Sequence, residues 1–128
     1  MKFGYSIIYV EDVVKTVSFY NQAFGFKTKM FTSEQDYAEL HSGETTIAFA
    51  NLNLANSNLS NGFQKIVNNK PPVGIELAFI TSDIENELQV ALDNGAKLLE
   101  PISQKSWGQK VAYIQDINGV LIELCSPI

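Results

Sequence analysis

The sequence contains no arginine. All nine of its basic residues are lysines, and 14 acidic residues bring the formal net charge to -5. Arginine supplies the planar fork that captures phosphate and carboxylate groups and reads guanine. An acidic chain without arginine is a poor nucleic-acid binder and a less suitable host for phosphorylated substrates. We therefore expect no nucleic-acid partner, and the charge favours a neutral or cationic ligand.

Histidine and cysteine are almost as scarce, with His41 and Cys125 each the only residue of its type. A single histidine excludes a zinc or iron site built from several histidines of one chain. A single cysteine excludes an intrachain disulfide, which favours a reducing, cytoplasmic location. No apolar run approaches the length of a membrane span and the first residues do not have the layout of a signal peptide, so we expect no membrane partner.

The C-terminal stretch, residues 107–127, has the clearest pattern in the chain. Two apolar segments, VAYI and VLIELC, read as strands around the turn sequence QDING. Asn118-Gly119 predicts a tight hairpin turn with positive φ at both residues. In the second strand, Glu123 shares one face with Leu121 and Cys125. A carboxylate inside so apolar a strand suggests a functional role.

The remaining pattern reads as a strand, a helix and three strands, occurring twice. Asp12 is the expected cap of the first helix and Gly25 its end. Ser82-Asp83 opens the second helix, where Ser82 and Glu85 suggest a capping box. We assign strands to residues 5–10, 26–31, 36–41, 45–50, 75–81, 97–100, 111–114 and 120–125.

The two halves align with each other, which indicates an internal duplication. Residues 10–13 match residues 81–84, and residues 46–49 match residues 121–124, so Ala48 is the counterpart of Glu123. We expect module one at about 1–51, a polar linker at about 52–72 and module two at about 73–128. The apolar residues of the linker suggest a short helix, and Phe63 is a candidate for part of a lid.

The sequence resembles the vicinal oxygen chelate superfamily, which groups glyoxalase I, bleomycin-resistance proteins and extradiol dioxygenases. The resemblance lies in Val10-Glu11-Asp12, Ser18-Phe19-Tyr20, Phe24-Gly25-Phe26, residues 113–119 and Ile122-Glu123-Leu124. It implies an α+β fold in which two tandem βαβββ modules form a cup-shaped, curved mixed sheet with the helices outside. The resemblance also implies a ligand inside the cup and a homodimer. It says less about chemistry, because one fold hosts many functions.

The resemblance places the family's four metal-binding positions at Tyr5, Ala48, Glu76 and Glu123. The family prefers His or Gln, Glu, His and Glu at these places, so only Glu123 matches fully. Glu76 offers an oxygen ligand, a protonated Tyr5 is a poor ligand and Ala48 offers none. Two carboxylates hold Mg or Mn only weakly. We therefore expect no resident cofactor, with a divalent metal as the alternative.

The most favoured function is binding of a small organic ligand, cationic or aromatic, in an acidic cup. Binding is favoured over catalysis, and Glu123 and Glu76 are the candidates if the protein is an enzyme. The alternative is a metal-dependent lyase or isomerase of the glyoxalase type that uses these two carboxylates. A vestigial cup is a third reading. The expected ligand-binding residues are Tyr5, Tyr9, Ala48, Glu76, Trp107, Tyr113 and Glu123.

Simpler structural roles compete with each of these assignments. Glu76 fits a solvated charge at a strand end, and Glu123 fits a hydrogen bond to the backbone or to Tyr5. Trp107 fits equally well a stacking wall for the ligand or a side chain packed beneath the linker. A surface position is favoured for His41 over one at the rim of the cup. Cys125 has no activating neighbour in sequence and is expected to be a passive thiol.

Overall fold

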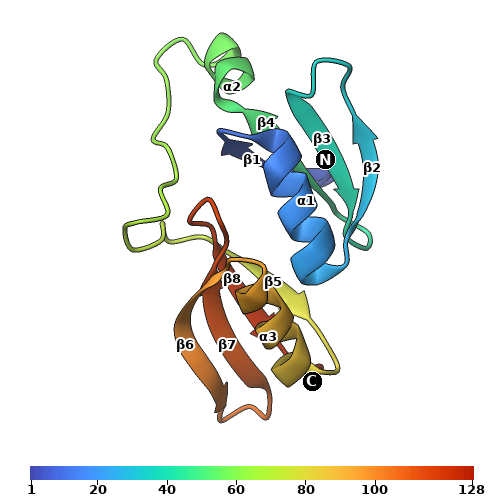
Figure 1. The fold of residues 1–128 in the computed structure, drawn as a ribbon, viewed down its shortest axis with the longest axis vertical. Coiled ribbons are helices and arrows are strands. Elements are labelled where there is room, and N and C mark those ends of the chain that lie inside the picture. The colour runs from blue at the N-terminus through green and yellow to red at the C-terminus, as the bar shows by residue number, and fades with distance from the viewer. The chain divides into compact units, whose positions relative to one another are not determined.

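The computed structural model describes residues 1–128 and divides into two compact units, residues 1–65 and residues 66–128. Unit 1 contains β1 (Tyr5–Val10), α1 (Val13–Phe24), β2 (Lys27–Phe31), β3 (Tyr37–His41), β4 (Thr46–Asn51) and α2 (Leu52–Asn58). Unit 2 contains β5 (Glu76–Ile80), α3 (Ile84–Asp93), β6 (Lys97–Gln104), β7 (Lys110–Gln115) and β8 (Leu121–Cys125). The predicted βαβββ order is therefore present in each unit (Figure 1). No helix is long and apolar enough to cross a bilayer.

Both sheets have the same topology, and this confirms the predicted α+β fold. The strand orders are β1-β4-β3-β2 and β5-β8-β7-β6. The pairs β1–β4 and β5–β8 are parallel and the other pairs are antiparallel. The registers agree with the sequence repeat, since Ala48 pairs with Ile7 and Glu123 pairs with Ala78.

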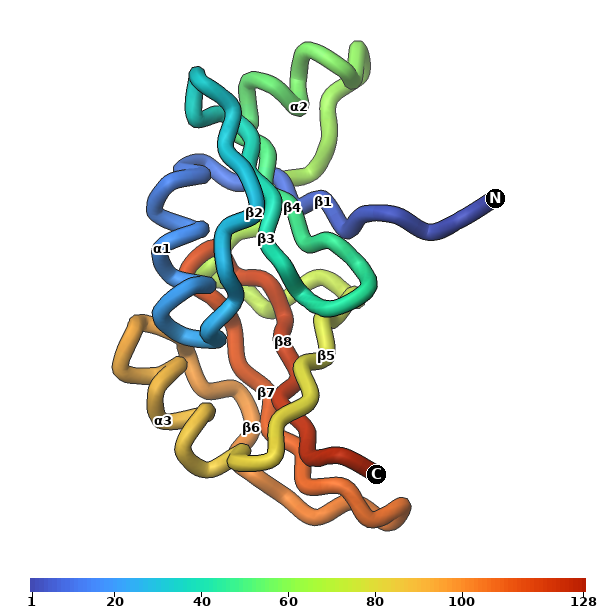
Figure 2. The backbone as a smooth tube through the Cα atoms, turned by 90° about the vertical axis from the view of Figure 1, so that its right-hand side faces the viewer, coloured from blue at the N-terminus to red at the C-terminus, as the bar shows by residue number.

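Each long helix covers one face of its own sheet (Figure 2). As predicted, Asp12 caps α1 by accepting a hydrogen bond from the Lys15 amide, and Gly25 ends the helix with φ 69°. The buried face of α1 contributes Tyr20, which is fully buried against Phe49 of β4 with a ring-centroid distance of 4.7 Å. In unit 2, Ile84, Leu88 and Ala91 of α3 are buried with Ile122 and Leu124 of β8.

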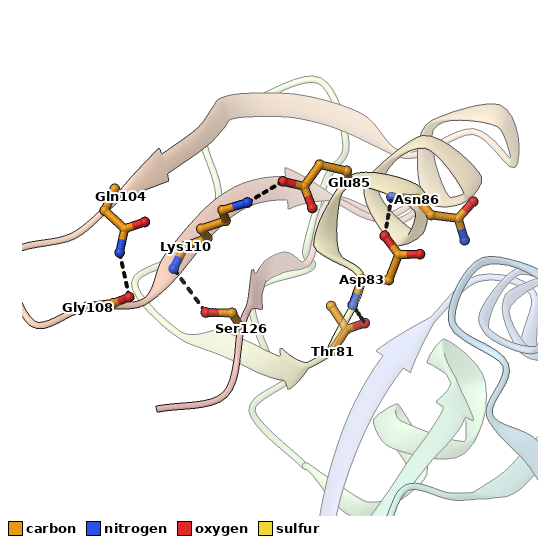
Figure 3. A network of polar contacts seen from close by, with 8 residues as sticks. All are labelled: Thr81, Asp83, Glu85, Asn86, Gln104, Gly108, Lys110 and Ser126. Carbon is orange, nitrogen blue, oxygen red and sulfur yellow. Dashed lines mark hydrogen bonds and ion pairs between the residues drawn. The ribbon is translucent and has the colours of Figure 1, made fainter.

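The predicted capping box of the second helix is wrong. The N-cap of α3 is Asp83, whose carboxylate accepts a hydrogen bond from the Asn86 amide at 3.3 Å. The hydroxyl of Thr81 accepts from the Asp83 amide at 3.1 Å, as Figure 3 shows. The helix therefore starts one residue later than the box requires, because aspartate is as good an N-cap as serine.

The predicted β7–β8 turn is also wrong in detail. Gly119 has φ 99°, but Asn118 does not have positive φ. The Gly119 amide donates to the Asp116 carbonyl, and Asp116 Oδ1 accepts from the amides of Asn118 and Val120 at 2.8 Å each. The buried carboxylate of Asp116 thus organises a longer turn that needs positive φ only at the glycine.

The segment between the sheets is more ordered than a simple linker. Its helix, α2, lies before the apolar residues that suggested one, and Asn51 caps it by accepting from the Leu54 amide. Phe63 packs edge-on against Tyr9 of β1, with ring centroids 4.9 Å apart.

Residues 67–70 form a second ordered part of this segment, here called the strap, which lies against the β7–β8 turn. Asn68 Nδ2 donates to the Ile117 carbonyl at 3.1 Å, and Gln115 Nε2 donates to the Lys70 carbonyl at 3.0 Å. The strap is therefore part of unit 2.

We call the face of each sheet that lies opposite its long helix the open face. Strand alternation and register place its residues without further assumptions. In unit 1 it comprises, on β1, β3 and β4, Tyr5, Ile7, Tyr9, Tyr37, Glu39, His41, Thr46, Ala48 and Ala50. In unit 2 it comprises Glu76, Ala78 and Ile80 of β5, Val111, Tyr113 and Gln115 of β7, Leu121, Glu123 and Cys125 of β8, and Glu100 of β6, the partner of Tyr113.

Candidate functional site

The open face of unit 2 carries the carboxylate that stood out in the sequence. Glu123 and Tyr113 are cross-strand neighbours on β8 and β7, and both are partly buried. The Tyr113 hydroxyl donates to Glu123 Oε2 at 2.9 Å. The expected structural partner of Glu123 was Tyr5 or the backbone, and the structure places Tyr113 there. Glu76 is exposed on β5, where it pairs with Leu121, so both carboxylates lie on one face.

The pKa of Tyr113 is raised by its hydrogen bond to Glu123 and by burial. Together they raise this pKa to about 12 from its ordinary value of 10.0. The charges of Glu123 and Glu76 act in the same direction. Tyr113 therefore serves as a neutral hydrogen-bond donor at neutral pH, with its proton held toward the carboxylate.

This coupling makes a direct prediction for Tyr113. Replacing Glu123 with Gln removes the charge and should lower the pKa of Tyr113 from about 12 toward 10. Because the native pKa is raised, the free energy of unfolding should fall as the pH rises from 10 to 12 in wild type, and less in Glu123→Gln. NMR titration of tyrosine ring carbons measures the pKa. Tyr37, also raised to about 12 but mainly by burial, is the internal reference and should not change. An unchanged pKa of Tyr113 would contradict the coupling.

Cys125 lies beside this pair and does not add a nucleophile. Its side chain is buried, and burial raises the pKa of the Cys125 thiol, with a further contribution from the Glu123 carboxylate. A neutral, buried thiol is a poor nucleophile. Its weak contact to the Phe79 carbonyl, 3.8 Å from Sγ, agrees with the expected passive role.

The β6–β7 hairpin brings a lysine close to Tyr113. No pattern in the sequence had pointed to this lysine. Lys105 Nζ lies 5.8 Å from the centroid of the Tyr113 ring, within range for a cation–π contact. Hydrogen bonds fasten the hairpin from Gln104 to the Gly108 carbonyl and from the Lys110 amide to Ser126 Oγ (Figure 3).

Trp107, at the tip of this hairpin, does not pack beneath the linker. Its side chain is 59% exposed, and its indole N–H donates to Gln109 Oε1 at 2.8 Å. Its role as a stacking wall stays a prediction.

The open face of unit 1 carries a second carboxylate–tyrosine pair, whose contact with each other and with Lys29 was not predicted. The Tyr37 hydroxyl donates to Glu39 Oε1 at 3.1 Å, and Lys29 Nζ lies 2.8 Å from Glu39 Oε2. The hydrogen bond from Lys29 holds the pKa of Glu39 below its usual value. The alternation of Tyr37 and Glu39 was visible in the sequence, but Lys29 lies at an irregularity of the β2–β3 register that no sequence pattern marked.

The other residues of unit 1 that the sequence analysis considered differ in how exposed they are. Tyr5 is 53% exposed, and Tyr9 is partly covered by Phe63. Ala48 is fully buried, between its strand partners Ile7 and Glu39. His41 is exposed at the end of β3, in agreement with the favoured surface position.

The donor set does not fit a dedicated metal site. No group of three or more His, Cys, Asp or Glu side chains in the chain is arranged to hold a metal ion. Ala48 supplies no ligand, and Glu123 already shares one oxygen with Tyr113. Catalytic metal sites normally need three protein ligands and an open position. The residues present therefore fall short of a catalytic metal site.

One pocket lies elsewhere in unit 1, with a volume of about 180 Å³ and a lining of Glu11, Asn51, Leu52 and Asn53. It contains none of the residues that the sequence predicted to bind a ligand or metal. Its lining belongs to the end of β4, the start of α2 and the residue after β1. The seven-residue α2 is too short to give this pocket the field of a long helix.

Comparison with known proteins gives a consistent result for the fold. The family model for the glyoxalase-like domain matches residues 3–128. A glyoxalase/bleomycin resistance protein/dioxygenase family enzyme from Burkholderia phytofirmans PsJN superposes with a TM-score of 0.81 and 18% identity, over 100% of both chains. A glyoxalase-related enzyme from Fulvimarina pelagi gives 0.82 and 14%, covering 99% of this chain and 88% of that chain.

A more distant neighbour is an integron cassette protein from the mobile metagenome of V. cholerae. It gives a TM-score of 0.66 and 22% identity, covering 100% of this chain and 96% of that chain. No curated protein matches the chain. At such identities the structural likeness shows the fold and leaves the chemistry to the residues of this chain. The resemblance to the vicinal oxygen chelate superfamily is confirmed.

Proposed function

Because the chain belongs to the glyoxalase-like domain family, we propose that it binds a small organic ligand on the open face of unit 2. The observation that carries the proposal is the Tyr113–Glu123 pair, a polar pair held in fixed geometry within an apolar sheet. Ligand sites are commonly apolar surfaces with a few oriented polar groups. Glu76 on the same face makes the site acidic, which suits a ligand with hydrogen-bond donors or positive charge.

The alternative is a metal-dependent lyase or isomerase that uses Glu76 and Glu123. The two carboxylates on one face are the only feature in its favour, and Ala48 and Tyr5 depart from the family's ligands. Binding therefore fits the donor set better than metal catalysis. The homodimer and the cytoplasmic location stay predictions.

Metal binding separates the two functions. Protein purified without chelator should contain far less than one equivalent of metal per chain. Millimolar Mg, Mn, Ni or Zn should raise the melting temperature by no more than about 3 °C, because a site with millimolar Kd adds only about 0.4 kcal/mol. A micromolar site would add about 4 kcal/mol and a shift above about 10 °C. Stoichiometric metal in the purified protein would contradict the proposal that the ligand binds without a metal. A melting-temperature shift above about 10 °C would contradict it as well.

Ligand binding itself is tested with a panel of small neutral, anionic and cationic compounds. Residue-resolved NMR should show changes at Tyr113 and along β7 and β8 for at least one compound. Amides on the outer surface of α3 should stay unchanged, which controls for general effects of the compound. If no compound in any charge class perturbs the open face of unit 2, the proposed function is wrong and the vestigial site is favoured.

A further inference from the structure

The same chemical pair occurs once on each open face: a tyrosine hydroxyl that donates to a glutamate. The donor is Tyr37 for Glu39 in unit 1 and Tyr113 for Glu123 in unit 2. In both pairs the tyrosine takes one carboxylate oxygen and leaves the other for a second donor. The two units differ in what that second donor is.

In unit 1 the second donor is a primary ammonium group. Lys29 Nζ lies 2.8 Å from Glu39 Oε2, the oxygen that Tyr37 does not use. The side chain of Glu39 is only 13% exposed, so the contact is partly desolvated. The chain therefore contains its own example of what a tyrosine–glutamate pair on such a face accepts.

In unit 2 no lysine takes this place. The ion pairs of the chain are Lys29–Glu39 and Lys110–Glu85, so Glu123 has no cationic partner and, beside Tyr113, only the weak thiol donor of Cys125. The cation of Lys105 lies over the ring of Tyr113 and makes no ion pair with Glu123. Glu76 and Glu100 add further negative charge to this face, and the field of Glu76 reaches both Tyr113 and Cys125. A partly buried carboxylate with another acid on its face favours a cation from outside the chain.

We propose that Glu123 binds the primary ammonium group of a ligand, as Glu39 binds Lys29. The inference rests on the proposed function and names the ligand class of that site. The ammonium donates to Glu123 Oε1, the oxygen that Tyr113 leaves, and Glu76 supplies a further acceptor on the same face. An ammonium carries three donors on a compact charge and suits such separate acceptors.

Other cations fit less well. A guanidinium binds best through both oxygens of a carboxylate, and Tyr113 already occupies one oxygen of Glu123. A quaternary ammonium needs free aromatic faces, but Lys105 lies over the ring of Tyr113. A divalent metal needs more oxygen ligands than two carboxylates supply. The geometry thus selects the primary ammonium among common organic cations.

The test compares four probes of similar size by NMR at low ionic strength: propylammonium, propylguanidinium, tetramethylammonium and 1-propanol. Propylammonium should bind wild type most tightly and shift the signals of Tyr113 and β8. Glu123→Gln should weaken this binding at least about tenfold, as expected for loss of a charge-assisted hydrogen bond. Glu44→Gln makes the same change of net charge at an exposed turn residue and should leave the affinity unchanged.

A second variant uses the Tyr37–Glu39 pair of unit 1. Lys29→Met frees Glu39 from its ammonium and should create a second propylammonium site, seen as new shifts at Tyr37 and β3. The inference is overturned if propylammonium binds no better than 1-propanol, or if Glu123→Gln and Glu44→Gln behave alike. A neutral or anionic compound that binds unit 2 when propylammonium does not would overturn the ligand class and leave the proposed function standing. No binding by any compound would remove both.

Discussion

Replacing Gly119 with Ala is expected to destabilise unit 2 by about 2–5 kcal/mol, because two effects act together. Gly119 has φ 99°, a conformation in which a side chain strains the backbone by about 1–2 kcal/mol. A Cβ there would also clash with the Val67 carbonyl oxygen and lie 2.8 Å from Asn68 Cα. Both are backbone atoms of the strap, so relief requires moving the strap, at a further cost of about 1–3 kcal/mol.

Gly108 provides the matched control for the Gly119 variant. It lies in the same unit with φ 104°, and a Cβ there would meet nothing within 4 Å. Gly108→Ala should therefore show only the backbone strain, and the difference between the two variants measures the contact with the strap. Urea unfolding gives the free energies, and amide exchange around Asn68 and Ile117 should rise only in Gly119→Ala. Equal losses of unfolding free energy in the two variants would show that the strap can move away at no measurable cost.

The repeated fold could be predicted from the sequence because its signals are local. Asp12 and Gly25 mark the ends of α1 by capping and by positive φ, which depend on few neighbours. The period-two pattern of β8 placed Glu123 on the face opposite Ile122 and Leu124. Aligning the halves then fixed Ala48 as the counterpart of Glu123, as the strand registers show.

The contacts within the candidate site could not be predicted in the same way. Lys29 reaches Glu39 through an irregularity between β2 and β3, and Lys105 reaches Tyr113 from a hairpin with two register shifts. Such irregularities re-aim single side chains without a strong sequence signal. The β7–β8 turn differs from the predicted two-residue hairpin because the side chain of Asp116 competes for backbone donors. It accepts hydrogen bonds from the amides of Asn118 and Val120, and these bonds hold a longer turn.

Replacing Phe49 with Ala is expected to be the most damaging single change in unit 1. Phe49 lies on β4 with 0% of its surface exposed, and its ring packs against Tyr20 of α1. Tyr20 also contacts Phe19 and Phe24, so the cavity would open inside an aromatic cluster whose rings are locked by one another. Rigid rings collapse poorly into a void, which places the expected loss at about 3–5 kcal/mol of unfolding free energy.

Phe3→Ala is the control for the loss of Phe49, because Phe3 precedes β1 and is 71% exposed. It removes the same atoms and should change the stability by less than about 0.5 kcal/mol. Amide exchange resolved by unit shows where the loss falls, and Phe49→Ala should reduce protection in β1, β3 and β4. A loss for Phe49→Ala below about 1 kcal/mol would mean that α1 moves in to fill the space.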